Sequence, residues 1–295
     1  MTATILNGRE LATTMRAEID EAVVKFKEKY SVTPTIAVVR AGEDPASVSY
    51  ANAIRRTAER RGMGFSVHVL PETARQEAVV ELVRQLSADT SIHGIMVQEP
   101  LPKGMDEAAV KEALSPEKDV DGVHAVNAGR LAQVAPAGRP PGVLDYFVPA
   151  TPAGGLEILK RQNVDISGKH AVVVGRSNIV GKPMSLLLLR QNATVTIAHS
   201  RTADLAEVCR SADILCAAVG RAKIITADMV KPGAVVIDFG VNFDDEGNMV
   251  GDVDFDAVKD VAGMITPVPG GTGPMTNVIL MLNVLEAARR QIKHS

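Results

Sequence analysis

The sequence predicts an α/β protein of two domains, and three features of the chain support this fold class. Its 295 residues exceed the length that a single hydrophobic core usually organises. Short apolar runs alternate with helical patterns in both halves, as in parallel sheets joined by crossover helices. A proline- and glycine-rich connector at 135–152 separates the halves. We therefore expect one domain at 1–148 and a second at 149–275, with a cleft between them.

The N-terminal half predicts a parallel sheet with right-handed crossovers. Strand-like apolar runs lie between segments whose apolar residues recur at helical spacing. The expected order is helix 8–29, strand 35–40, helix 45–61, strand 65–70, helix 73–88 and strand 94–97. Ligands of such sheets bind beyond the carboxyl ends of the strands, so the residues that follow 97 are candidates for a site.

The connector and the C-terminal half repeat this alternation. Pro136, Pro140, Pro141 and Pro149 prevent the connector from continuing a helix or a central strand. Strands are expected at 170–174, 194–198, 214–218 and 235–239, with helices between them. A final apolar helix runs from 276 to about 293, and we expect segment 276–295 to pack back on the N-terminal domain.

The first strand of the C-terminal half ends in a turn suited to phosphate binding. The turn reads Gly175-Arg176-Ser177-Asn178-Ile179-Val180-Gly181 and leads into a helix, whose first N–H groups are expected to point outward unpaired. It differs from the standard dinucleotide pattern, because Ser177 replaces the middle glycine and the last glycine comes one residue late. The segment predicts a Rossmann-like nucleotide-binding domain.

The end of the next strand indicates which nucleotide is bound. An acidic residue at this point binds the ribose of NAD, whereas this chain has His199-Ser200-Arg201. Ser200 and Arg201 can donate charge-assisted hydrogen bonds to the extra phosphate of NADP. The alternative is a solvated basic loop after an edge strand. The cofactor is expected to be NADP, and its predicted contacts are Gly175, Arg176, Ser177, Ile179, Ser200, Arg201 and Val241.

Composition excludes several other classes of protein. The net charge is −3, with 46% hydrophobic and 23% charged residues, which does not suit a nucleic-acid-binding protein. The basic group at 55–61 is expected to be a solvated helix face. No apolar run approaches a membrane span and no leader precedes the first helix, so we expect a cytoplasmic protein. The two cysteines and six scattered histidines do not predict a metal site.

Four turn-rich segments identify a family. They are Pro45-Ala46-Ser47 before Tyr50, Val97-Gln98 before Pro100-Leu101-Pro102, Lys118-Asp119-Val120-Asp121-Gly122, and Thr266-Pro267-Val268-Pro269-Gly270-Gly271-Thr272-Gly273-Pro274-Met275-Thr276. With the Gly-Arg-Ser-x-Ile-Val-Gly-x-Pro turn, the chain closely resembles the methylenetetrahydrofolate dehydrogenase/cyclohydrolase family over nearly its whole length. The resemblance implies a folate-binding catalytic domain, an NADP domain and a homodimer.

The resemblance also assigns roles to residues of these segments. Gln98, Asp121 and Tyr50 are the implied catalytic residues: Asp121 accepts hydrogen bonds from the pterin edge, and Tyr50 stacks on or bonds to the folate. The implied substrate-binding residues are Tyr50, Ile54, Val97, Gln98, Glu99, Asp121, Pro269, Gly270, Gly271 and Gly273. From the residues alone, Asp121 is equally a turn aspartate, Gln98 a loop cap and Tyr50 a half-buried core aromatic.

Three positions depart from the family pattern. The family has its proton-transferring lysine where this chain has Ile54, and an isoleucine cannot move a proton. Glu99 replaces a leucine, and its carboxylate either favours the cationic product, acts as a substitute base or faces water. Ala150 replaces a cysteine. The connector before it, which contains Tyr146 and Phe147, is longer than usual and is expected to alter the rim of the cleft or a dimer contact.

These departures lead to a functional expectation with alternatives. We expect NADP-dependent oxidation of 5,10-methylenetetrahydrofolate to persist, because hydride transfer depends on alignment more than on a base. Cyclohydrolase activity is expected to be weak or absent. The alternatives are a fully bifunctional enzyme, an inactive nucleotide-binding paralogue, and an unrelated NADP dehydrogenase such as one acting on shikimate, which would leave the Pro-Gly-Gly run unexplained.

Overall fold

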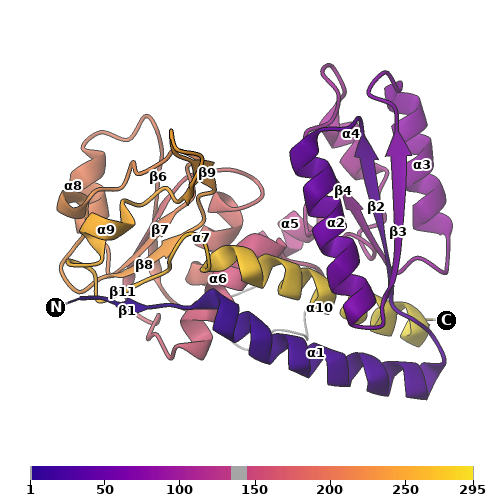
Figure 1. The fold of residues 1–295 in the computed structure, drawn as a ribbon, viewed down its shortest axis with the longest axis horizontal. Coiled ribbons are helices and arrows are strands. Elements are labelled where there is room, and N and C mark those ends of the chain that lie inside the picture. The colour runs from indigo at the N-terminus through magenta and orange to yellow at the C-terminus, as the bar shows by residue number, and fades with distance from the viewer. Residues whose placement is uncertain (1, 134–144, 295) are drawn as a thin grey trace. The chain divides into compact units, whose positions relative to one another are not determined.

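The computed structural model describes residues 2–133 and 145–294 (Figure 1). Residues 135–144 of the predicted connector, including Pro136, Pro140 and Pro141, lie outside the described residues. The described residues form two compact units. The six-stranded unit comprises 2–14, 131–133 and 149–278, and the three-stranded unit comprises 15–130, 145–148 and 279–294. Within the described residues, no helix has the length and apolar character needed to cross a membrane.

The three-stranded unit is built on a parallel sheet in the order β3-β2-β4. Its strands are β2 (Thr35–Ala41), β3 (Gly64–Leu70) and β4 (Gly94–Val97), and its helices include α2 (Pro45–Arg60), α3 (Gln76–Ala88), α4 (Glu107–Glu112) and the first residues of α5 (Ala125–Gln133). Val39 of β2 and Ile95 of β4 share a buried cluster with Val83 of α3 and Val110 of α4. This cluster fixes α4 beside the strand that ends at Val97.

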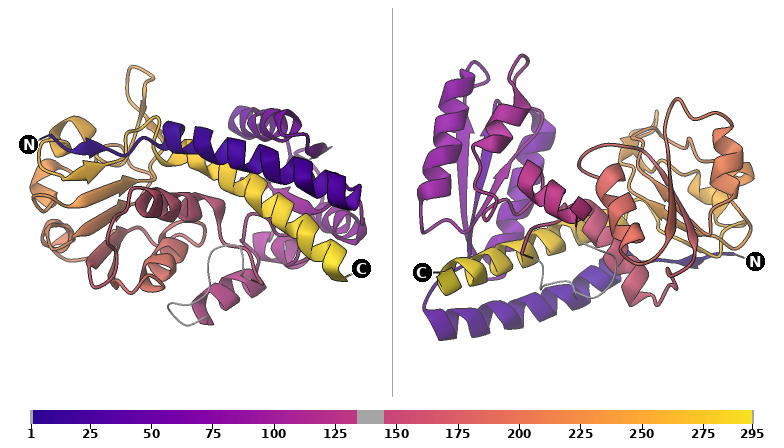
Figure 2. Two further views of the ribbon diagram at one scale, coloured as in Figure 1. Left: turned by 90° about the horizontal axis from the view of Figure 1, so that it is seen from below. Right: turned by 180° about the vertical axis from the view of Figure 1, so that it is seen from behind.

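Two long helices, α1 (Gly8–Tyr30) and α10 (Thr272–His294), contribute their first residues to the six-stranded unit and the remainder to the three-stranded unit. Within the three-stranded unit they run side by side (Figure 2). Val284 of α10 lies against Gly94 of β4, and the Asn283 amide donates to the Val120 carbonyl at 2.8 Å. The later part of α10 therefore contacts residues of the N-terminal half of the chain.

The six-stranded unit contains a parallel sheet in the order β1-β11-β8-β7-β5-β6. Its strands are β1 (Thr4–Ile5), β5 (His170–Val174), β6 (Thr194–Ala198), β7 (Ile214–Ala217), β8 (Val235–Asp238) and β11 (Met264–Ile265). Its other elements are α6 (Ala150–Arg161), α7 (Gly181–Leu189), α8 (Leu205–Arg210), η1 (Ala227–Met229), α9 (Phe255–Val258), and the β9 (Asn242–Phe243) and β10 (Met249–Val250) pair.

This topology creates a nucleotide-binding switch point. From β5 the chain crosses to β6 on one side, and it then returns to β7 on the other side of β5. In doubly wound sheets ligands bind where the strand order reverses in this way, beyond the carboxyl ends of the strands. The predicted α/β class and the Rossmann-like sheet are confirmed.

Most predicted elements are confirmed to within a few residues. The exceptions have local causes. The helix predicted at 73–88 begins at Gln76, because a turn closed by the Ala74 N–H on the Pro71 carbonyl precedes it. The last helix begins at Thr272 instead of 276, and its early Pro274 needs no N–H partner there. The two-residue strands β1 and β11 were not predicted, because two residues show no alternation.

Candidate functional site

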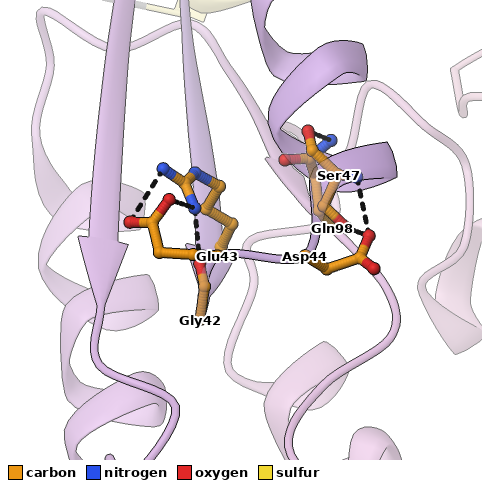
Figure 3. Close-up of polar contacts among 6 residues, drawn as sticks. Gly42, Glu43, Asp44, Ser47 and Gln98 are labelled. Carbon is orange, nitrogen blue, oxygen red and sulfur yellow. Dashed lines mark hydrogen bonds and ion pairs between the residues drawn. The ribbon is translucent and has the colours of Figure 1, made fainter.

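Gln98 lies immediately after β4 and is held by two neighbouring elements (Figure 3). Its backbone N–H donates to the Val39 carbonyl at 2.8 Å, and its side-chain Nε2 donates to the Ser47 carbonyl at 3.1 Å. Only 5% of Gln98 is exposed, and its Oε1 atom is buried without a hydrogen-bond partner in the structure. A buried amide oxygen left unpaired costs free energy, which a ligand donor would recover.

The turn that carries Ser47 is itself braced. Asp44 caps α2 by accepting from the Ser47 N–H at 2.8 Å and from the Ser47 hydroxyl at 3.0 Å (Figure 3). Arg40, at the end of β2, pairs with Glu43 at 3.0 Å and donates to the Gly42 carbonyl. Ser47 belongs to one of the sequence motifs, but the sequence analysis predicted no role for it. The structure shows that its carbonyl positions the Gln98 side chain.

Asp121 is brought to the same strand end by backbone pairing. Ile95 of β4 forms a parallel bridge with Asp119, and the Ile95 N–H donates to the Lys118 carbonyl at 2.7 Å. Asp121 lies in the turn that directly follows this bridge. The fully buried Asp119 carboxylate accepts from the N–H groups of Val123 and His124, which fixes the turn that follows Asp121.

Electrostatic interactions connect Asp121 to four other side chains. The pKa of Asp121 is raised from 3.8 to about 7, mainly by burial and then by the nearby carboxylates of Asp119 and Glu99, with Lys111 opposing the rise. Burial, and then the charge of Asp121, raises the pKa of the Tyr50 hydroxyl. Tyr50 is therefore protonated at neutral pH and can donate a hydrogen bond.

Glu99 forms an ion pair with Lys111 of α4. The Lys111 Nζ lies 2.5 Å from a Glu99 carboxylate oxygen and 3.7 Å from Glu107, and the side chains of Glu99 and Lys111 are 37% and 25% exposed. Glu99 is exposed and is paired with Lys111 from α4, so the three interpretations of its role stay predictions. Lys111 lies outside the sequence motifs. Its contact with Glu99 becomes visible only in the structure, where α4 packs against β4.

Ile54 and Tyr50 lie one turn apart on α2 and face inward to different degrees. Ile54 is fully buried, whereas Tyr50 is half-buried. Arg55 and Arg56 are exposed, as predicted for a solvated helix face. Arg61 departs from that prediction: its side chain is 8% exposed and its Nε atom lies 3.6 Å from Asp20.

In the six-stranded unit, the turn after β5 is closely packed. Gly175 has φ +132°, and a Cβ atom there would lie 2.1 Å from the Ala218 carbonyl oxygen that follows β7. A Cβ atom on Gly181, the first residue of α7, would lie 2.3 Å from the Gly175 carbonyl oxygen. Only glycine fits these two positions. Arg176, Ser177 and Ile179 between them are exposed, so a phosphate can approach the turn.

One expectation about this turn is wrong. The N–H groups of Val180 and Gly181 were expected to be unpaired, but they donate to the Ser177 hydroxyl oxygen at 3.1 and 3.3 Å. The serine closes the turn that leads into α7, as serine hydroxyls often do in such turns. A phosphate on this turn would therefore contact other donors or displace the serine hydroxyl.

The other predicted nucleotide contacts lie on exposed loops of the same unit. Ser200 and Arg201 follow β6 in a turn in which the His199 N–H donates to the Thr202 hydroxyl at 2.8 Å. Val241, after β8, is 61% exposed. No acidic side chain stands at the end of β6.

Two buried aspartates hold the loops after β7 and β8, and the sequence did not indicate them. Asp252 accepts from the N–H groups of Val219, Gly220 and Arg221 at 2.5 to 3.0 Å. Asp238 accepts from the N–H groups of Gly240, Asp252 and Val253. Burial, although opposed by these hydrogen bonds, raises the pKa of Asp238 to about 6.

The glycine-rich run lies at the start of α10 in the six-stranded unit. Gly270 has φ +116°, and its carbonyl accepts from the Arg9 N–H at 3.1 Å. A Cβ atom on Gly8 would lie 1.8 Å from the Gly271 carbonyl oxygen, so the N-terminal segment packs directly on this run. Pro269 and Gly273 are exposed, and a Cβ atom on Gly273 would meet no atom within 4 Å.

The structure separates some predicted features from the site. Tyr146 and Phe147 are each 2% exposed, and the Arg290 guanidinium lies 4.4 Å from the Phe147 ring centre. They are core side chains. The effect of the longer connector on the cleft rim or a dimer contact stays a prediction, because residues 135–144 lie outside the described residues. Ala150 is 1% exposed and begins α6. Cys209 and Cys216 are buried, and the described residues contain no cluster of His, Cys, Asp and Glu suited to a metal ion.

Comparison with known proteins identifies the family. Residues 6–121 match the sequence model of the tetrahydrofolate dehydrogenase/cyclohydrolase catalytic domain, and residues 149–292 match that of the NAD(P)-binding domain. The chain belongs to the tetrahydrofolate dehydrogenase/cyclohydrolase family. The site described above in the three-stranded unit therefore falls within the catalytic domain of that family, and the switch point of the six-stranded unit falls within its NAD(P)-binding domain.

Relatives of the tetrahydrofolate dehydrogenase/cyclohydrolase family match the chain from end to end. A bifunctional protein FolD of Roseiflexus sp. (strain RS-1) is 54% identical over 292 residues, covering 99% of this chain and 98% of that protein. The crystal structure of the bifunctional enzyme FolD from Campylobacter jejuni has a TM-score of 0.92 at 38% identity, covering 98% and 99% of the two chains. A Trypanosoma brucei FolD structure, complexed with NADP cofactor and inhibitor, has a TM-score of 0.92 at 34% identity, covering 99% of each chain.

Proposed function

We propose that this chain oxidises 5,10-methylenetetrahydrofolate to 5,10-methenyltetrahydrofolate with NADP as hydride acceptor. The observation that carries the proposal is the buried, unpaired Oε1 atom of Gln98 at the end of β4, in the region that also holds Asp121 and Tyr50. Such an arrangement presents hydrogen-bonding groups that the protein itself leaves unsatisfied, at the sheet edge where ligands bind.

Each of the three residues has a distinct role in this proposal. Asp121, when ionised, accepts paired hydrogen bonds from the amino-pyrimidinone edge of the pterin. Tyr50 stays protonated and packs against or donates to the folate. Gln98, held through Ser47, directs its free oxygen at the substrate, and this rigid support favours a reactive alignment.

The six-stranded unit supplies a site that fits NADP. Gly175 and Gly181 leave no room for a Cβ atom, and the exposed Arg176, Ser200 and Arg201 present donors suited to phosphate groups. The bound nicotinamide would supply the hydride-accepting carbon. The residues of this chain hold and orient the nucleotide, and Asp252 fixes the loop after β7 for that purpose.

We further propose that cyclohydrolase activity is weak in this chain. Ring opening must add water and release a proton, and the fully buried Ile54 offers no group for either step. A second candidate is full bifunctionality, which is favoured by the relatives named bifunctional protein FolD. The inactive-paralogue alternative predicts no reduction of NADP with methylenetetrahydrofolate.

Parallel assays distinguish these functions. Reduction of NADP is followed by absorbance with methylenetetrahydrofolate, and hydrolysis by the loss of methenyltetrahydrofolate absorbance relative to buffer. We expect rapid reduction and hydrolysis close to the buffer rate in the wild type, with a gain of about tenfold or more in hydrolysis for Ile54→Lys. Ile54→Met is the control, since it has similar size without an amine. Wild-type hydrolysis far above the buffer rate would establish the bifunctional alternative.

Thermal melting accompanies these assays, because Ile54 is fully buried and a lysine there is costly. If Ile54→Lys melts like Ile54→Met and hydrolysis stays unchanged, our account of position 54 is rejected. If Ile54→Lys does not fold, the comparison of wild-type hydrolysis with the buffer rate still decides between the two candidates.

We also propose the assembly and organisation of the protein. The domains are 1–148 and 149–275, with 276–295 returning to the first domain, and the protein is a cytoplasmic homodimer. An edge strand of the six-stranded unit, β6, pairs with β5 alone among the described strands and exposes 44% of Ile197. Light scattering coupled to size exclusion would give a mass of two chains, and Ile197→Lys would reduce it to one if β6 forms the contact.

A further inference from the structure

A fully buried carboxylate, that of Asp252, holds the loops that follow β7 and β8. It accepts from the backbone N–H groups of Val219, Gly220 and Arg221 at 2.5 to 3.0 Å. The Asn242 side-chain amide also donates to it, at 2.9 Å. Successive N–H groups directed at one anion make a concave binding site in the backbone. Here the protein's own carboxylate fills that site, so these N–H groups fix the loop and are not donors for a nucleotide phosphate.

One peptide group connects this carboxylate to the phosphate turn after β5. The N–H of the Ala218–Val219 peptide donates to Asp252 at 2.5 Å. The carbonyl oxygen of the same peptide packs on the turn so closely that a Cβ atom on Gly175 would lie 2.1 Å from it. Because a peptide group is planar and rigid, a shift of the Asp252 carboxylate would move the surface on which the Gly175 turn packs.

A second buried carboxylate, that of Asp238 at the end of β8, extends the connection to the glycine-rich run at 267–271. Asp238 is 2% exposed, and its side chain accepts from the Asp252 N–H at 3.1 Å. Its own N–H donates to the Thr266 hydroxyl at 2.8 Å, and its carbonyl accepts from the Thr272 hydroxyl at 2.9 Å. The two threonines flank the run, so both ends of the run are tied to the aspartate that also holds Asp252.

The packing around the two aspartates leaves no space for adjustment. A Cβ atom on Gly251 would lie 1.9 Å from an Asp238 carboxylate oxygen, and one on Gly240 would lie 2.3 Å from the Asp252 backbone nitrogen. Burying two carboxylates costs free energy that their hydrogen bonds must offset, so stability alone does not explain them. Their location does, because the segments that they join lie at the carboxyl edge of the sheet, where ligands bind.

We infer that Asp252 and Asp238 are positioning residues, which hold the phosphate turn and the glycine-rich run at a fixed separation and so align the bound nucleotide with the substrate. All residues of this connection belong to the six-stranded unit. The inference rests on the proposed function, in which the turn holds NADP and the run contacts the folate. Neither aspartate transfers a proton or a hydride. Both act through neighbouring groups, and hydride transfer depends on the alignment that they maintain.

Kinetics at saturating NADP test the alignment. Asp252→Asn keeps the size of the side chain but replaces one acceptor oxygen by a donor, which opposes the N–H groups of the loop. We expect kcat to fall about tenfold or more, with the KM for methylenetetrahydrofolate within about threefold of the wild type. The value of kcat is expressed per NADPH-binding site, counted by fluorescence titration, so that unfolded protein does not contribute.

Asp213→Asn is the matched control for this variant. Asp213 directly precedes β7, at the end opposite to the loop, and its carboxylate accepts from the His170 N–H at 3.0 Å. The control therefore also removes a carboxylate that holds a backbone N–H of the same sheet, but it lies outside the connection. Its kcat should stay within about twofold of the wild type.

A milder variant tests the other end of the connection. Thr266→Val removes the hydroxyl that accepts from the Asp238 N–H, so kcat should fall about threefold to tenfold, and Thr266→Ser should restore most of it. If both residues act in one connection, the double variant Asp252→Asn/Thr266→Val should lie no more than about twofold below the lower single variant. Losses that multiply, or single variants within about twofold of the wild type, would overturn the inference.

Amide NMR of protein labelled with ¹⁵N-glycine tests the connection without activity. Thr266→Val should shift the signal of Gly220, which donates to Asp252 at 3.0 Å, and this measurement remains available if Asp252→Asn does not fold. Asp252→Asn should shift the signal of Gly271, whereas Asp213→Asn should shift neither. A wild type that does not reduce NADP would reject the proposed function, while these signals would still test the connection. Signals that stay in place in folded variants would overturn it.

Discussion

Asp121→Asn should make the protein more stable at neutral and alkaline pH, although it weakens substrate binding. Asp121 is half-buried, and burial together with the neighbouring carboxylates raises its pKa from 3.8 to about 7. An acid whose pKa is raised by folding binds its proton more tightly in the folded state. Its contribution to stability is therefore complete below about pH 4 and is lost as the pH rises through about 7.

The size of the stability change follows from the difference between the two pKa values of Asp121, 3.8 and about 7. One pH unit corresponds to about 1.4 kcal/mol, so ionising Asp121 within the fold costs on the order of 4 kcal/mol above pH 7. Asparagine has no charge to desolvate but still buries an amide, which offsets part of the gain. We expect the free energy of unfolding of Asp121→Asn to exceed that of the wild type by about 2 kcal/mol at about pH 8 and to match it near pH 4.

Urea unfolding followed by circular dichroism at several pH values measures this difference. Asp89→Asn is the control with the opposite sign, because hydrogen bonds from Ser91 lower the pKa of this exposed carboxyl. A carboxyl whose pKa is lowered by folding stabilises the folded state at pH values above its pKa in the unfolded chain, and this stabilisation is lost in acid. Asp89→Asn should therefore be slightly less stable than the wild type at pH 8. An Asp121→Asn protein no more stable than the wild type at pH 8, or equally stabilised at pH 4, would refute the reasoning.

Two further predictions concern the nucleotide site. Gly175→Ala places a Cβ atom 2.1 Å from the Ala218 carbonyl oxygen, so the turn must shift and the Kd for NADPH, measured by fluorescence titration, should rise about tenfold or more. Gly129→Ala, in α5 with open space around it, should leave binding unchanged. Arg201→Ala should reduce the preference for NADP over NAD in kcat/KM by about 10-fold to 100-fold; Lys169→Ala, at the opposite end of β5, should not, and an equal loss in both would reject the phosphate contact.

The sequence predicted the helices and strands that show a clear pattern of apolar residues within their own segments. Strands of four to seven residues, such as β2 and β5, carry enough apolar or β-branched residues to be recognised, and the helices between them show clear spacing. The two-residue strands β1 and β11 depend on pairing with each other and with β8, so no local pattern indicates them. Their pairing is a property of the folded sheet.

The candidate site divides in the same way. Gln98 and Asp121 were found because motifs contain them, but the bridge between Ile95 and Asp119 that brings them to one strand end is a long-range pairing. Ser177 was predicted to contact the nucleotide, and its hydroxyl also accepts from the N–H groups of Val180 and Gly181, because a serine before a helix satisfies local donors as readily as a ligand. Lys111 was missed because its partner belongs to another element.

The departures at positions 54 and 99 have a common electrostatic consequence. An isoleucine at 54 removes a cation that the family resemblance places beside Tyr50, and Glu99 adds an anion, so both changes make the region of Asp121 more negative. Lys111 restores one positive charge from α4. A negative region stabilises the methenyl cation formed by hydride transfer. The two departures therefore act on the same step of the proposed oxidation.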